Sequence, residues 1–330
     1  MKKGLKSFAC AIMLSVVAVA QTPPDRKPDP ILVVFSKGDL FEAGKTGLTN
    51  ELKYDFAVEP FSMTEKTTPG DLGNKVTALS PAAVVLLGNF PISLYAKYCT
   101  ERKDKTASVP VVASHALDVR RATAPIGKSL CISYETPMIT ALVNFRQVMF
   151  PSLEKVGVLY RKSYAEFIER NSRLCQNEKI TVKSLLIGDD ASTQKKEIAQ
   201  ALDELLNKEH IQAFWAPNDS KFFKVEYLTE IWIPIFLKTK VPVIVGVESL
   251  VKPEINFGTY AVIPDPEAMG AQAARLVEDL KDENWQIDST VIFPAISTYS
   301  VLNLKKASMI TDEKNINMTK VTKILREGKN

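Results

Sequence analysis

Histidine is almost absent from this 330-residue sequence, in which His115 and His210 are the only two. His210 stands in a charged stretch, Lys208-Glu209-His210, and is expected to be solvated. His115 follows an apolar stretch and could line a cavity, but a loop histidine satisfied by water is the favoured interpretation. One histidine without partners makes neither a metal site nor a catalytic triad. Since G-x-S-x-G and H-E-x-x-H motifs are missing too, we predict a protein that is not an enzyme and needs no cofactor.

A nucleotide-binding loop is also missing, although one stretch looks like it. Gly38 and Gly44-Lys45-Thr46 follow an apolar run, but five residues separate the two glycines where the phosphate-binding motif has four. The intervening Asp39 and Glu42 would repel phosphate. We therefore expect no nucleotide site here.

Cysteine is scarce and forms no recognisable pattern. Beyond Cys10, the sequence holds Cys99, Cys131 and Cys175, with neither a C-x-x-C pair nor a metal-ligand spacing. An oxidising compartment would permit one disulfide and leave one thiol. The sequence does not decide whether any two of them pair.

The N-terminal apolar run is too short to span a membrane. Phe8 to Val19 covers about a dozen residues, whereas a membrane-spanning helix needs about 20. The run follows Lys2, Lys3 and Lys6 and ends in Ala18-Val19-Ala20, the small-x-small pattern that signal peptidase recognises. These features predict a cleaved signal peptide at 1–20 and a periplasmic protein.

Net charge of one sign is small in the mature chain. Three charges of the formal +4 belong to the predicted signal peptide, and the polar tail at 311–330 carries five basic and three acidic residues. The remaining body is close to neutral, so we expect no nucleic-acid or membrane partner. The tail itself is expected to fray.

What the sequence does contain is an alternation of short apolar runs with longer amphipathic stretches. Runs with apolar residues on both faces suit parallel strands covered by helices. Repeated units of this kind predict an α/β fold of two doubly wound parallel-sheet lobes. The clearest predicted strands are 31–35, 82–87, 109–113, 156–160, 182–187, 213–216, 241–247 and 291–293, and the clearest helices are 40–52, 92–99, 138–150, 164–176, 195–206 and 265–280.

Polar residues cluster where predicted strands end, which is where open parallel sheets bind ligands. Residues of this kind before helices are also ordinary caps, so each cluster has a purely structural interpretation. Aromatic residues nearby would supply an apolar wall, although Trp215 could equally belong to the core. The candidate ligand-binding residues are Asn89, Phe90, Ser133, Tyr134, Tyr160, Asn218, Asp219 and Glu248.

From residue 133 onward the chain resembles a known family in the order and spacing of several segments. These include Ser133-Tyr134-Glu135-Thr136-Pro137, Lys155 to Tyr160, Ala216 to Ser220, Val241 to Ile244, Asp265 to Ala274 and Asn303 to Ala307. They are similar to ABC-transporter substrate-binding proteins of the tryptophan/tyrosine-binding type, with the type I periplasmic binding protein fold. Two departures, Val247 in place of an acidic residue and Ser133-Tyr134 in place of Ser-Asp, weaken the implication of an α-amino ligand.

The resemblance implies three chain crossings between the lobes. Lobe one would hold 31–130 and 250–283, lobe two 131–249 and 284–310, with hinges near 130–133, 249–251 and 283–286. It implies a monomer that captures a small molecule, an amino acid or related solute, and delivers it to an ABC permease in the inner membrane. Alternatives are a periplasmic sensor module acting on a receptor kinase, an exported α/β enzyme, and a cleft that has lost its ligand.

Overall fold

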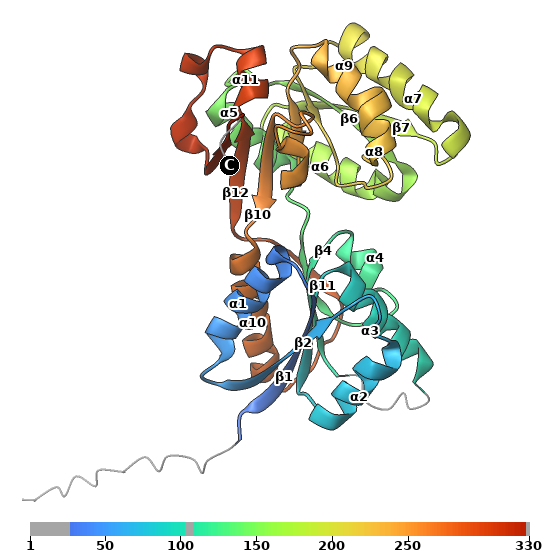
Figure 1. The fold of residues 1–330 in the computed structure, drawn as a ribbon, viewed down its shortest axis with the longest axis vertical. Helices are drawn as coiled ribbons and strands as arrows, with labels where there is room; N and C mark the ends of the chain where they lie inside the picture. The colour runs from blue at the N-terminus through green and yellow to red at the C-terminus, as the bar shows by residue number, and fades with distance from the viewer. Residues whose placement is uncertain (1–26, 103–108, 328–330) are drawn as a thin grey trace, which may run out of the picture.

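The computed structural model describes residues 27–102 and 109–327. They form two lobes, one above the other in Figure 1, and each is built on its own β-sheet. The signal peptide predicted at 1–20 lies outside the described residues. Within those residues, no helix has the length and apolar character needed to span a bilayer.

The sheet of lobe one is parallel throughout, in the strand order β11-β5-β4-β3-β1-β2. Alternate residues of a strand face opposite sides of a sheet. In β1, Ile31 and Val33 accordingly pack into one apolar cluster while Leu32 and Val34 pack into another. The strands are β1 (Asp29–Ser36), β2 (Phe56–Met63), β3 (Ala83–Leu87), β4 (Val111–Ala116), β5 (Leu130–Ser133) and β11 (Val291–Pro294).

Helices cover both faces of this sheet. α1 (Asp39–Leu52) and α10 (Pro266–Asp282) pack on one face, and α2 (Pro69–Leu79), α3 (Asn89–Glu101) and α4 (Val119–Thr123) on the other. Glycines allow α1 and α10 to approach closely: a Cβ at Gly47 would lie 2.0 Å from the Glu267 carbonyl oxygen. Gly44, from the stretch resembling a nucleotide loop, lies in the body of α1.

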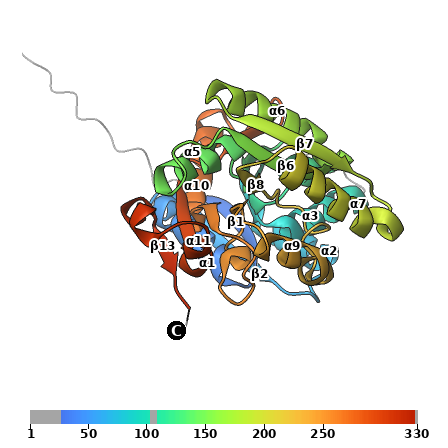
Figure 2. The same ribbon diagram turned by 90° about the horizontal axis from the view of Figure 1, so that it is seen from above.

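The sheet of lobe two has the order β13-β12-β10-β9-β8-β6-β7 and is parallel except for the antiparallel pair β10 and β12. α5 (Met138–Val148), α6 (Ala165–Asn177) and α11 (Leu304–Ile310) contribute to one apolar cluster, and α7 (Ala191–Asp203) and α9 (Ile233–Leu237) to the other. Figure 2 shows α6 and α7 on opposite sides of β6 and β7. The strands are β6 (Lys155–Arg161), β7 (Thr181–Ile187), β8 (Ala213–Trp215), β9 (Val243–Val245), β10 (Tyr260–Pro264), β12 (Thr298–Asn303) and β13 (Lys323–Leu325).

The chain crosses between the lobes three times, as predicted, but at other positions. The crossings are 134–137, Asp265 and 295–297, because β5 and β11 pair within the first sheet whereas β10 pairs within the second. The predicted boundaries at 130/131, 249/250 and 283/284 are therefore displaced. The Asp265 N–H donates to the Ser297 carbonyl at 3.0 Å, which joins the second and third crossings. On α10, Gln272 bonds the Pro294 carbonyl and the Ile296 N–H.

One further expectation, that of a frayed tail, is corrected. The tail beyond 310 is not frayed as far as residue 327: Ile316 is buried and β13 extends the second sheet beside β12. Apolar residues spaced through the polar tail provide the physical reason, because they pack against α5 and α11. Cys99, Cys131 and Cys175 are all free thiols.

Candidate functional site

A cavity of about 320 Å³ lies between the lobes, within the size range of small-molecule sites. Lobe one supplies the loop after β4, the end of β5 and strand β11, while lobe two supplies α6 and the turn before it. Its lining residues are Asp118, Val119, Arg120, Ser133, Glu135, Pro137, Ser163, Tyr164, Glu166, Phe167, Arg170, Asn171, Leu174, Ile292, Phe293 and Pro294.

Aromatic side chains form the lobe-two wall of this cavity. Phe167 stacks on Trp215 of β8 with ring centroids 6.2 Å apart, and Tyr164 meets Phe167 edge-on. Trp215 is 5 % exposed and belongs to the core, and it lines the smaller recess described next rather than the cavity itself. Such a wall suits an apolar or aromatic part of a ligand.

A smaller recess continues from the cavity toward the ends of β8 and β9. It is shared with the cavity at Glu135 and Phe167, and it is also lined by Thr136, Asn218 and Gly246. The Thr136 hydroxyl is buried without a hydrogen-bond partner in the described part of the chain. A Cβ at Gly246 would come within 2.4 Å of the Asn218 side-chain oxygen, so glycine makes room for this amide. The recess therefore offers hydrogen bonds beside an apolar wall.

Glu135 connects the first crossing to lobe one. Its carboxylate accepts hydrogen bonds from the Asp118 N–H and, at 2.7 Å, from the Ser133 hydroxyl. The Ser133 oxygen in turn accepts from the Glu135 N–H. Burial raises the pKa of Glu135, while these hydrogen bonds oppose the rise. The predicted residue Ser133 thus lies at the cavity, but its hydroxyl holds the crossing segment.

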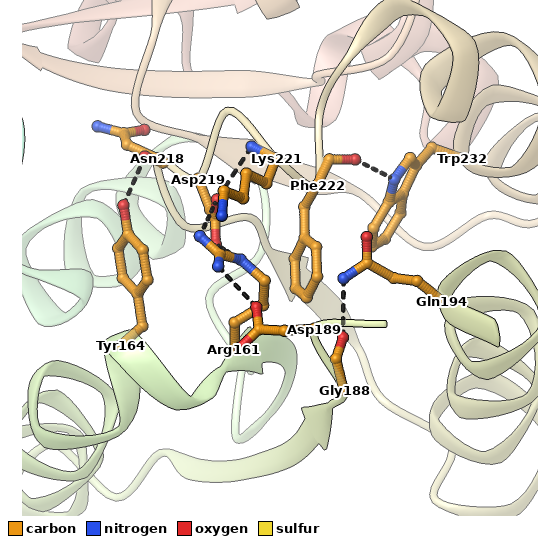
Figure 3. Close-up of polar contacts among 10 residues, drawn as sticks. All are labelled: Arg161, Tyr164, Gly188, Asp189, Gln194, Asn218, Asp219, Lys221, Phe222 and Trp232. Atoms are coloured by element: carbon orange, nitrogen blue, oxygen red, sulfur yellow. Dashed lines mark hydrogen bonds and ion pairs between the residues drawn. The ribbon is translucent and has the colours of Figure 1, made fainter. Parts of the chain in front are cut away.

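The loop after β8 is held by a buried ion pair (Figure 3). The Arg161 guanidinium donates to both Asp219 oxygens, at 2.6 and 2.9 Å, and to Asp189 at 2.8 Å. Arg161 and Asp219 are almost fully buried, whereas the Asp189 side chain is 57 % exposed. The hydrogen bonds that Arg161 donates to the Asp219 carboxylate are the main cause of a raised Arg161 pKa, and the hydrogen bond from Arg161 lowers the pKa of Asp189.

This ion pair changes what the predicted pair Asn218 and Asp219 does. Asp219 was predicted to orient a ligand, but its carboxylate already serves Arg161 and the Lys221 N–H. The Tyr164 hydroxyl donates to the backbone carbonyl of Asn218 at 2.8 Å (Figure 3), and Asn218 also lines the recess. Arg161 and Tyr164 were missed by the sequence analysis. The only signal was an arginine ending an apolar strand.

The remaining predicted residues lie away from the cavity lining. Asn89 bonds the Leu117 N–H and carbonyl and lines a separate cavity of about 520 Å³ on lobe one. Phe90 is the second residue of α3 and is 41 % exposed. Tyr160 packs against the apolar cluster under α5 and α6. Thus Asn89 and Asn218, both predicted to bind the ligand, line different cavities.

Two predicted residues lie near the crossings. Tyr134 packs against apolar clusters of both lobes. The Glu248 carboxylate accepts from the Tyr299 hydroxyl at 2.9 Å and pairs with Lys323 of β13 at 2.5 Å. These partners tie the C-terminal strand to the end of β9, so the Glu248 carboxylate is already engaged.

His115 is not the solvated loop residue that was expected. It belongs to β4, is 4 % exposed and has its Nε2 2.9 Å from the Pro266 carbonyl, to which an Nε2–H donates. Its Nδ1 is buried without a partner in the described residues. Burial lowers the pKa of His115 to about 4. Gly44 makes this packing possible, because a Cβ there would lie 2.5 Å from Nε2. His210 is exposed, as expected.

Solved structures with the same arrangement of lobes are numerous. An ABC domain in complex with L-Trp from Streptococcus pneumoniae is 15 % identical, with a TM-score of 0.51, and the match covers 91 % of this chain and 100 % of that one. A ligand-free, open substrate-binding protein with adhesive properties from Clostridium difficile is 13 % identical, at the same coverage, with a TM-score of 0.62. This chain has a type I periplasmic-binding-protein-like fold.

Another neighbour with a fold of this type has a lower TM-score. The transcription regulator CcpA of Lactococcus lactis is 14 % identical, with a TM-score of 0.47, and the match covers 83 % of this chain and 97 % of that one. By sequence, no family model and no curated protein matches the chain. The neighbours are binding proteins and transcription regulators, and the specific tryptophan/tyrosine-binding type stays a prediction.

Proposed function

We propose that this protein captures a small solute between its lobes and delivers it to an ABC permease. The observation that carries the proposal is the cavity between the lobes, lined by strand ends and helices of both. A solute that touches both lobes only in a closed form would favour closure by its differential affinity for that form. Substrate-binding proteins of transporters among the structural neighbours support this function.

Capture is tested by a thermal-shift screen of the purified protein against amino acids, organic acids and sugars. A solute that binds only the native state raises the unfolding midpoint, by about 2.7 kcal/mol in free energy at a hundredfold excess over Kd. The same solute should reduce the radius of gyration in small-angle scattering, because the lobes close. Conversion of the solute into a product would instead establish an enzyme.

Export is part of the proposal. It rests on the lysines, the apolar run and the Ala18-Val19-Ala20 site in the first twenty residues. Expression of the whole chain in a bacterium should release a periplasmic protein whose N-terminal residue is Gln21. An uncleaved cytoplasmic product would count against it. Permease and ATPase genes beside the coding gene would support delivery to a transporter, whereas a receptor-kinase gene would favour a sensor.

A further inference from the structure

Two arginines line the cavity from opposite lobes without a carboxylate partner. Arg120 belongs to α4 of lobe one and Arg170 to α6 of lobe two. Neither forms a salt bridge within the described part of the chain, although salt bridges are frequent elsewhere on the surface. Both guanidinium groups are therefore free to bind an anion.

The neighbouring arginines on the same helices behave differently. Arg121 pairs with Asp118 at 2.9 Å, and Arg173 pairs with Glu169 at 3.1 Å. Arg121 thereby takes the carboxylate closest in sequence to Arg120. Each free arginine at the cavity thus has a paired counterpart on its own helix.

The contrast is sharpest along α6. Glu166 precedes Arg170 by the same four residues that separate Glu169 from Arg173, a spacing that favours pairing on a helix. Only the second pair forms. The Arg170 guanidinium lies over the Phe167 ring instead, 5.8 Å from its centroid, and Glu166, Phe167 and Arg170 all line the cavity. Arg170 is thus positioned by the aromatic wall of the site.

The acidic groups of the cavity do not neutralise these arginines. Asp118 is paired with Arg121, and the two Glu135 oxygens accept from the Asp118 N–H and the Ser133 hydroxyl. Glu166 is left as the one carboxylate of the lining without an ion pair or hydrogen bond in the described residues. Two cations approaching each other as the lobes close would repel, unless an anion lies between them.

We propose that the solute is a small organic acid whose carboxylate bridges Arg120 and Arg170, with its apolar part against Phe167. This inference rests on the proposed capture function and adds the chemical class of the ligand. Guanidinium groups bind carboxylates through paired hydrogen bonds in a fixed geometry. Since such a bridge joins the two lobes, the anion itself would supply the affinity difference that drives closure.

The test uses pairs of compounds that differ in charge alone. Phenylacetate is compared with phenylacetamide, and L-phenylalanine with L-phenylalaninamide, alongside succinate, succinamide and glucose, by thermal shift and calorimetric titration of the purified protein. We expect carboxylates to bind and their amides not to. Arg120→Gln and Arg170→Gln should each weaken carboxylate binding by about tenfold or more, as loss of a charged hydrogen bond does.

Matched controls remove the same charge from the same helices. Arg121→Gln and Arg173→Gln should leave carboxylate binding within about twofold, and all four variants should keep the unliganded midpoint because the replaced side chains are exposed. Binding of only neutral or cationic compounds, or equal losses in all four variants, would overturn the inference while leaving capture intact. A panel in which nothing binds would count against both.

Discussion

Replacing Lys306 by methionine should stabilise the protein at neutral pH. Lys306 lies on α11, is 3 % exposed and donates only to the Asn256 carbonyl, at 3.1 Å. Burial lowers the pKa of its ammonium group to about 8. Methionine has a similar length and no charge, so it keeps the packing and removes the cost of burying an ammonium group.

The size of the effect follows from the pKa. Lowering it from about 10.4 to about 8 corresponds to about 3 kcal/mol. Loss of the hydrogen bond to the Asn256 carbonyl costs about 1 kcal/mol, which offsets part of the gain from removing the buried charge. We therefore expect the Lys306→Met free energy of unfolding to exceed that of the wild type by about 2 kcal/mol at pH 7.

The contribution of Lys306 to the free energy of unfolding depends on pH, and the direction follows from its lowered pKa. The folded state binds this proton less tightly than the unfolded state, so the stability linked to Lys306 is complete above about pH 10.4 and is lost as the pH falls through about 8. Urea unfolding of wild type and variant, followed by tryptophan fluorescence, should give free energies of unfolding that approach each other as the pH rises from 8 and cross before about pH 10.4. Lys305→Met, an exposed position paired with Glu327, is the control and should change stability little. A variant less stable than wild type at pH 7, or a pH-independent difference, would refute the reasoning.

Three other perturbations test the packing around the site. Because the pKa of His115 is about 4 in the folded state, the free energy of unfolding should decline by about 3 kcal/mol as the pH falls from about 6.5 to 4. In the His115→Asn variant, urea unfolding should show no such decline. Asp219→Asn should lower the free energy of unfolding by about 3 kcal/mol, because it leaves buried Arg161 with Asp189 alone. Asp189→Asn, at an exposed position, should lower it by less than about 1 kcal/mol. Equal losses in the two variants would show that burial does not govern the strength of these ion pairs. Gly47→Ala should destabilise by about 3 kcal/mol or prevent folding, because its Cβ meets the Glu267 carbonyl, while Gly70→Ala, with its nearest neighbour at 3.6 Å, should be tolerated.

The sequence predicts several strands in both interior and edge positions and misses others: the edge strands β7 and β11 were predicted, whereas the edge strand β2 was not. β1, β3 and β6 are continuous apolar runs, because helices cover both of their faces. β2 was missed, since it lies at a sheet edge and includes Glu59 and Pro60, which suit an edge but interrupt an apolar run. β10 and β12 were missed as well, and their pairing across the second sheet displaced the predicted crossings.

Two of the predicted ligand-binding residues line the candidate site, and most of the others do not. Strand ends gave Ser133 and Asn218, which line the cavity and its recess. The pairing of Arg161 with Asp219 spans 58 residues, so no local pattern announces that the carboxylate is already bound. An apolar aromatic wall was predicted, but its main residue was missed, because Phe167 looks like one more apolar position of α6.

The hydrogen bond between Asp265 and Ser297, together with the two hydrogen bonds of the Gln272 side chain beside it, restricts how the lobes can move relative to each other. The second and third of the three crossings between the lobes are joined by hydrogen bonds and act as a single connection, while residues 134–137 form the other connection. Two lobes connected at two such places rotate easily about the line that passes through both connections, and they resist twisting about the long axis of the molecule. We therefore expect every closure to bring the lobes together in the same relative orientation, with the two walls of the cavity correctly aligned.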